Sequence, residues 1–118
     1  MYREITICFD KAISWNTFYS GKHWFMRKKL KDEWNERVRE QMSRFDVIKF
    51  DTFHIKVEHN TRCDADNLCI QKFVCDYMKE NGWCEDDNRK YFKKYSCEVN
   101  DELPKGMSKI TIFGYENI

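Results

Sequence analysis

Residues 50–59 read FDTFHIKVEH, and apolar and polar side chains alternate along this stretch. In an extended chain Phe53, Ile55 and Val57 would share one face, while polar side chains would occupy the other. This pattern predicts a β-strand that is buried on one face only. The apolar face of such a strand needs a second layer to cover it.

The segments on either side of this strand predict the helices of that second layer. In residues 25–43 an apolar residue recurs every fourth position, at Leu30, Trp34, Val38 and Met42, opposite a face of Arg, Lys and Glu. Residues 67–80 form a second helix with a broad apolar face. Asp66 or Asn67 can cap its start. Asn81-Gly82 marks its end, since both residues accept a left-handed backbone.

Three further strands are expected, over residues 2–9, 90–99 and 108–115. The last two are separated by NDELPKG and are predicted to pair as an antiparallel hairpin. The order β-α-β-α-β-β then gives an α+β fold, in which two main helices pack on a small mixed sheet. The length of 118 residues fits one domain, 1–118.

Composition excludes several classes of protein. The chain contains no apolar run long enough for a membrane-spanning helix and no apolar signal core at its start, so we expect it in the cytoplasm. Its six cysteines form no Cys-x-x-Cys pair, which favours free thiols over zinc ligands or disulfides. The net charge of +1 conceals 35% charged residues, so patches of both signs are expected.

Two acidic pairs bracket the second predicted helix: Asp64 and Asp66 precede it, and Asp86 and Asp87 follow it. In an extended segment residues i and i+2 point the same way, so Asp64 and Asp66 could chelate one hard cation. Mg²⁺ prefers such oxygen ligands, and Asp87, with Asp86 beside it, could complete the set. The alternative is that the first pair caps the helix and the second forms a turn.

The order of the whole stretch adds information that spacing alone does not carry. DADN, a helix with Lys72 and Asp76, then Gly82 and EDD before a strand, resembles the RusA family of Holliday-junction resolvases. Residues 14–34, SWNTFYSGKHWFMRKKLKDEW, also resemble phage-type members of that family. The resemblance covers nearly the whole chain. It implies a Mg²⁺-dependent endodeoxyribonuclease, with Mn²⁺ as a substitute, that acts on four-way DNA junctions as a homodimer.

The resemblance also implies roles for individual residues. The metal carboxylates of the family fall on Asp64, Asp66 and Asp87. Its functional lysine, which lies one helical turn after the second Asp, falls on Ile70 instead. Lys72 lies two residues later and keeps the spacing to Asp76, so either the helix carries an insertion or the lysine role has moved. An exposed lysine without a role is the alternative.

Cations and one amide are expected to contact the DNA backbone. Arg62 precedes the first Asp, as arginines do in the family, and the interleaving of basic and aromatic residues after residue 88 is typical of a nucleic-acid-binding face. The expected contacts are Arg62, Asn67, Arg27, Arg89 and Lys93. The alternative for each cation is a solvated surface side chain, and the alternative for Asn67 is a helix cap.

The reach of the chain limits how the carboxylates can meet. A helix over residues 67–80 is about 20 Å long, and the following seven residues span at most about the same length. Asp87 can therefore return to Asp66 only if the chain doubles straight back; otherwise it would enter the site of a second subunit. A reversal at Asn81-Gly82 favours the single-chain arrangement. Two rivals to a nuclease stay open: a module that binds junctions or single-stranded DNA without cutting, and a structural protein.

Overall fold

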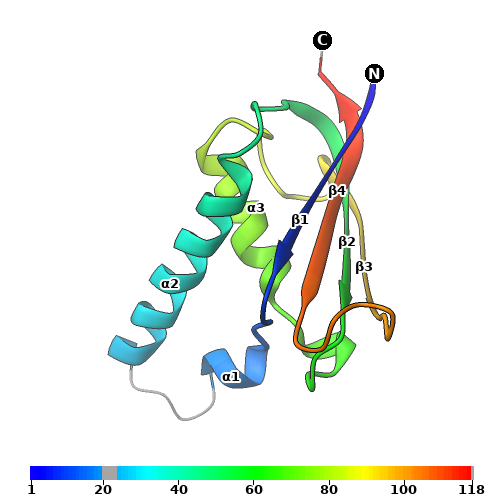
Figure 1. Cartoon of the computed structure of the whole chain (residues 1–118). Helices are drawn as coiled ribbons and strands as arrows, with labels where there is room; N and C mark the ends of the chain where they lie inside the picture. The colour runs from blue at the N-terminus through cyan, green and yellow to red at the C-terminus, as the bar shows by residue number, and fades with distance from the viewer. Residues whose placement is uncertain (20–23, 118) are drawn as a thin grey trace.

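The computed structural model describes residues 1–19 and 24–117 and has four strands in one mixed sheet, with helices packed on one side of it (Figure 1). In chain order the elements are β1 (Tyr2–Phe9), α1 (Trp15–Tyr19), α2 (Trp24–Met42), β2 (Phe50–His59), the short 3₁₀ helix η1 (Ala65–Asn67), α3 (Ile70–Glu80), β3 (Phe92–Val99) and β4 (Ser108–Glu116). The predicted α+β class, with two main helices on a small mixed sheet, is confirmed.

The pairing of the strands differs from the prediction. The order across the sheet is β1-β4-β2-β3, so the last two strands do not form a hairpin. β4 lies between β1 and β2 and is antiparallel to both, while β3 runs parallel to β2 at the far edge. Burial fits this arrangement: Ile110, Thr111 and Ile112 of β4 are buried in succession, so both faces of this central strand are covered, whereas β3 is largely exposed.

This topology brings the carboxyl ends of three strands to the same end of the sheet. Since β1, β2 and β3 all run opposite to β4, their carboxyl ends lie at the end of the sheet where β4 begins. The segments after β1 and β2 therefore meet the turn that precedes β4 (Figure 1). The segment that carries Asp64 and Asp66 also leaves β2 at this end of the sheet.

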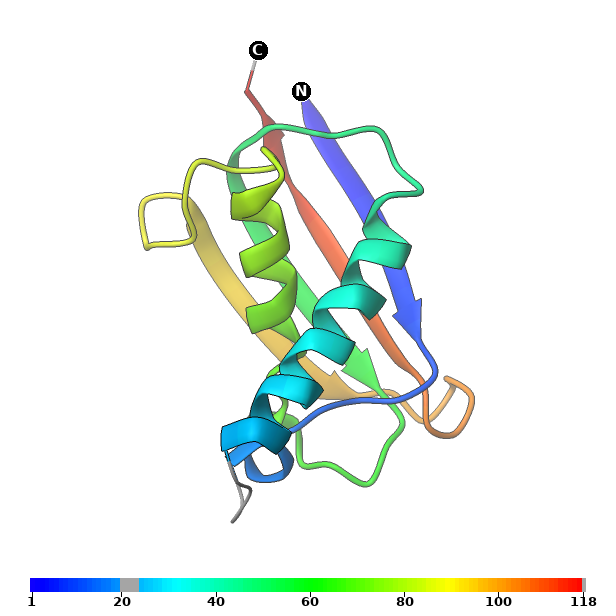
Figure 2. The same cartoon turned by 90° about the vertical axis from the view of Figure 1, so that its left-hand side faces the viewer.

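The core lies between the sheet and the two longer helices, which run side by side over one face (Figure 2). α2 contributes Trp34, Val38 and Met42 to this core, as its four-residue periodicity predicts. The ring of Trp34 stacks on that of Phe73 of α3, with centroids 6.5 Å apart. α3 is therefore fixed on both its sheet side and its α2 side, and its two ends point to opposite ends of the molecule.

α3 begins later than predicted. Its first residue is Ile70, preceded by Cys69 as a cap without a side-chain hydrogen bond, so neither Asp66 nor Asn67 caps it. The N–H of Cys69 donates to the carbonyl of Ile13 at 3.0 Å, and Leu68 bridges to Ser14, which keeps this stretch out of the helix. The predicted end is confirmed: Asn81 is the C-cap, and Gly82 has φ +78°.

Other expectations can be compared directly. The six cysteines are free thiols. No helix among the described residues is long and apolar enough to cross a membrane. The short helix α1, begun by Ser14, whose Oγ accepts the N–H of Thr17 at 3.1 Å, was not predicted. Residues 20–23 of the basic stretch 14–34 lie outside the described residues.

Candidate functional site

Asp64 and Asp66 lie on the segment that joins β2 to α3, and both are exposed. Asp64 is extended, but Ala65–Asn67 form the single turn η1, closed by the N–H of Asn67 donating to the carbonyl of Asp64 at 3.0 Å. The expectation that an extended chain aligns the two side chains is therefore wrong. A 3₁₀ turn has three residues per turn, so positions two apart do not share a face.

This segment is held at both ends. At its start the Thr61 hydroxyl lies 2.9 Å from Nδ1 of the buried His59 and accepts the N–H of Cys63 at 3.2 Å. At its end, the N–H and the thiol of Cys69 both contact the carbonyl of Ile13. Asp64 and Asp66 are thus exposed side chains on an anchored backbone, which is the arrangement that a ligand site requires.

Two of the predicted cations lie close to the acidic pair in the chain. Arg62 is exposed, and Lys72 lies in the first turn of α3, with its Nζ 5.9 Å from the centre of the Trp15 ring. This distance is within the range of a cation–π contact, which orients the ammonium group without neutralising it. Within residues 1–19 and 24–117, neither Arg62, Lys72 nor either carboxylate forms an ion pair.

The second acidic pair lies at the other end of α3. Asp87 pairs with Lys79 of the last helical turn, Oδ1 to Nζ 3.4 Å, and Lys79 also approaches Asp76 at 3.9 Å. Desolvation alone would lower the pKa of Lys79, but the charge of Asp87 and the hydrogen bond to it, together with Asp76, raise that pKa overall. Lys79 is therefore a charged partner that keeps Asp87 beside the end of α3.

Asp86 stabilises the turn that presents Asp87. Its Oδ1 accepts the N–H of Asp87 at 2.7 Å, and its Oδ2 accepts the side-chain amide of Asn88 at 3.1 Å. The hydrogen bond from the Asp87 backbone is the main reason why the pKa of Asp86 is lowered. Both oxygens of Asp86 already have partners, as the turn alternative predicts, whereas the Asp87 carboxylate is paired with the exposed Lys79.

The structure does not bring the three predicted metal carboxylates together in one chain. Asp64 and Asp66 precede α3, whereas Asp87 pairs with Lys79 of its last turn. The helix itself has eleven residues and is about 16 Å long. No group of three His, Cys, Asp or Glu side chains that could hold a metal occurs among the described residues. The single-chain site that the sequence favours therefore stays a prediction, to be tested against a site shared between two subunits.

The remaining predicted DNA contacts are spread over the surface. Asn67 is half-buried in η1, and Arg27 is half-buried on α2. Arg89 lies in the turn before β3 and Lys93 on that edge strand, both exposed. Arg89 and Lys93 therefore lie on the same segment of the chain as Asp87, whereas Arg62 lies on the segment of Asp64.

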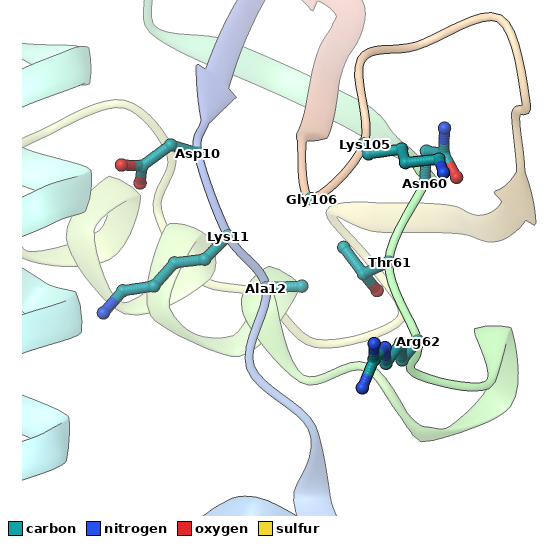
Figure 3. Close-up of a pocket in the computed structure, with 8 residues that line it drawn as sticks. All are labelled: Asp10, Lys11, Ala12, Asn60, Thr61, Arg62, Lys105 and Gly106. Carbon is teal, nitrogen blue, oxygen red and sulfur yellow. The ribbon is translucent and has the colours of Figure 1, made fainter.

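A pocket at the carboxyl ends of β1 and β2 was not predicted. Its volume is about 670 Å³, and it is lined by three segments that are distant in sequence (Figure 3): Asp10, Lys11 and Ala12; Asn60, Thr61 and Arg62; Lys105 and Gly106. The sequence signal for it is weak, because these segments meet only once β4 is known to lie between β1 and β2. Arg62 belongs to both this pocket and the acidic segment.

Comparison with known proteins adds no assignment. No protein-family model matches the sequence, and no curated protein matches it. Function must therefore be argued from the residues and their geometry.

Proposed function

We propose that this protein is a Mg²⁺-dependent, structure-selective endodeoxyribonuclease of the RusA type, which resolves four-way DNA junctions by paired nicks as a cytoplasmic homodimer. The observation that carries the proposal is the ordered set DADN, a helix with Lys72 and Asp76, Gly82 and EDD. It is supported by the exposed carboxylates of Asp64 and Asp66, which form no ion pair with the described residues and lie on a backbone anchored beside Arg62 and Lys72.

The donor chemistry of the acidic segment suits a hard divalent cation. Mg²⁺ in phosphoryl-transfer sites is typically held by one or two carboxylates together with substrate phosphates. Asp64 and Asp66 would supply those carboxylates, and Mn²⁺ takes the same oxygen ligands. When bound, the ion would supply a Lewis acid for the scissile phosphate and activate water.

The cations of this segment would bind and orient the substrate. Lys72, steadied by the Trp15 ring, would stabilise negative charge that develops on the phosphate. Arg62, which is exposed and forms no ion pair with the described residues, would bind a neighbouring phosphate with its planar fork of donors. Asn67, half-buried in the same turn, is the remaining expected DNA contact there.

A dimer would reconcile the geometry with a three-carboxylate site. Because Asp64 and Asp66 lie at one end of α3 and Asp87 at the other, a two-fold axis that sets two α3 helices antiparallel would bring Asp87 of each subunit toward Asp66 of its partner. Such an isologous interface creates two equivalent sites. A four-way junction, with its approximate two-fold symmetry, offers two strands to cut.

The test is cleavage of a labelled four-way junction with and without Mg²⁺. Asp66→Asn should abolish cleavage and leave junction binding largely intact, because it keeps the side-chain shape and removes the charge that the cation needs. Asp46→Asn is the matched control: Asp46 is also exposed, lies in the α2–β2 connection and should tolerate the change. Full nicking by a folded Asp66→Asn protein would show that the metal assignment is wrong.

One observation favours a second candidate, a module that grips junction or single-stranded DNA without cutting it. Within the described part of the chain no three metal-capable side chains cluster, and Asp86 serves a turn. This candidate predicts salt-dependent binding of the junction but no nicking at any concentration of Mg²⁺ or Mn²⁺.

A further inference from the structure

The pocket at the carboxyl ends of β1 and β2 is built from backbone that the sheet fixes in place. The N–H of Gly106 donates to the carbonyl of Asn60 at 2.6 Å, and the side-chain amide of Asn60 donates to the carbonyl of Leu103 at 2.7 Å. Ser108 Oγ donates to the carbonyl of Lys11 at 2.7 Å. The three lining segments are therefore tied to one another, so the pocket is a feature of the fold.

The charges that line the pocket are not balanced. Asp10 pairs with Arg37, Oδ1 to Nη1 3.2 Å, and Lys11 pairs with Glu33, Nζ to Oε1 2.9 Å. Both side chains extend toward α2 and away from the other two lining segments (Figure 3). In this arrangement the carboxylate of Asp10 and the ammonium of Lys11 are paired with side chains of α2 and are not directed at the other two segments.

Two positive side chains and several hydrogen-bond donors remain. Arg62 and Lys105 are exposed and form no ion pair with the described residues, and in Figure 3 the Arg62 side chain extends toward the side on which Ala12 lies. The backbone N–H groups of Lys11, Ala12 and Arg62 also have no hydrogen-bond partner among the described residues. A pocket that offers cations and N–H groups, and whose one lining carboxylate, Asp10, is turned toward α2 and paired with Arg37, suits a phosphate group.

We propose that this pocket binds a backbone phosphate of the DNA, next to the one held at Asp64 and Asp66, with Arg62 and Lys105 as its charged contacts. The position of Arg62, shared between the pocket and the acidic segment, makes the two phosphates neighbours along one strand. The inference rests on the proposed function for the identity of the ligand as DNA, and on the geometry alone for the site. Phosphate contacts of this kind fix the register of a nucleic acid on a protein.

The experiment titrates the full chain, without divalent ions, with tetrathymidylate that lacks terminal phosphates, and follows backbone amides by NMR. The amides of Thr61, Arg62 and Gly106 should shift saturably. Arg62→Ala and Lys105→Ala should each weaken binding about tenfold, the low end for a hydrogen bond to a charged group. Each should also reduce the slope of log affinity against log salt, by about 0.7 for a single strand.

Lys49→Ala is the matched control, because Lys49 is an exposed lysine at the opposite end of the sheet, just before β2. It should leave the affinity unchanged within about twofold. Equal weakening by Lys49→Ala and Lys105→Ala, or unmoved pocket amides, would overturn the pocket assignment. Inorganic phosphate that shifts the same amides at lower concentration than tetrathymidylate would overturn DNA as its ligand.

A nicking assay on the unmodified protein separates this inference from the proposed function. If tetrathymidylate binds the pocket as described but no junction is cut with Mg²⁺ or Mn²⁺, the nuclease proposal fails and the phosphate pocket stands. If the junction is cut while the pocket amides stay unmoved, the nuclease proposal stands and the phosphate pocket fails.

Discussion

His59 ends β2 with a completely buried imidazole, beside the strand end where the acidic segment begins. Its Nδ1 lies 2.9 Å from Thr61 Oγ1, while Nε2 has no hydrogen-bond partner among the described residues. Burial disfavours the charged form of the ring, so the pKa of His59 is lowered. The neutral imidazole therefore helps to hold Thr61, and through it the backbone that leads to Asp64.

This burial predicts how stability depends on pH. The unfolded chain takes up a proton on His59 near pH 6.5, whereas the folded chain stays neutral to lower pH. The free energy of unfolding should therefore fall as the pH falls through about 6.5, with a slope of at most about 1.4 kcal/mol per pH unit from this group. Urea unfolding of the unmodified protein and of His59→Gln, between about pH 5 and 8, measures the effect. Parallel curves for the two proteins would contradict the prediction.

At the scale of the elements, β4 lies against the backbone of β2 at Gly114 with no room for a side chain. The register of β2 against β4 shifts between Phe50 and Thr52. A Cβ on Gly114 would overlap the carbonyl oxygen of Thr52 and lie 2.8 Å from Cα of Phe53. Backbone atoms cannot move aside as a flexible side chain can, so this contact requires glycine.

Gly114→Ala should therefore destabilise the fold by about 3 kcal/mol or more, at the upper end for overpacking. Gly82→Ala is the comparison: nothing lies within 4 Å of a Cβ there, and only the φ of +78° opposes it, which costs about 1–2 kcal/mol. Midpoints of urea unfolding would rank the two variants. A smaller loss for Gly114→Ala than for Gly82→Ala would show that the sheet can open at this point.

The strands and helices could be predicted where a single period dominates. Alternation marked β1 and β2, and the four-residue repeat marked α2, each within a residue of its observed bounds. The pairing of β3 with β4 was wrong because strands that follow each other in the chain favour a hairpin locally, whereas β4, buried on both faces at Ile110, Thr111 and Ile112, lies between β1 and β2. The start of α3 was misplaced because the hydrogen bond from Cys69 to Ile13 is a tertiary contact.

The candidate site could be predicted only where its residues are neighbours in the sequence. Local sequence identified Asp64, Asp66 and Arg62 as neighbours on one connection, which needs no knowledge of the topology. It could not place Lys105 near Arg62, because that proximity depends on the strand order. It also could not show that Asp87 stays beside Lys79, because an extended connection of the same length could have reached further back.

At the scale of the whole molecule, the question is whether the three carboxylates of one site come from one chain or from two, because Asp87 is separated from Asp64 and Asp66 by α3. Asp87 lies beside the last turn of α3, and Asp64 precedes its first turn. If Asp64, Asp66 and Asp87 act together, a site completed by a partner subunit fits this geometry without refolding either end of the helix. A site within one chain would require Asp87 to move from Lys79 toward the start of α3.

Mixing Asp64→Asn protein with Asp87→Asn protein, each inactive alone, distinguishes the two arrangements. If Asp87 crosses to the partner, a heterodimer has one site with both substitutions and one with neither. It should regain one working site and nick one strand of a four-way junction per encounter, at up to half the activity per dimer. If each site is made by one chain, every site carries one lesion and the mixture stays inactive. Mass spectrometry of the exchanged subunits, and a mixture of Asp64→Asn with Asp66→Asn that should stay inactive in either case, control for failed exchange and for contaminating unmodified protein.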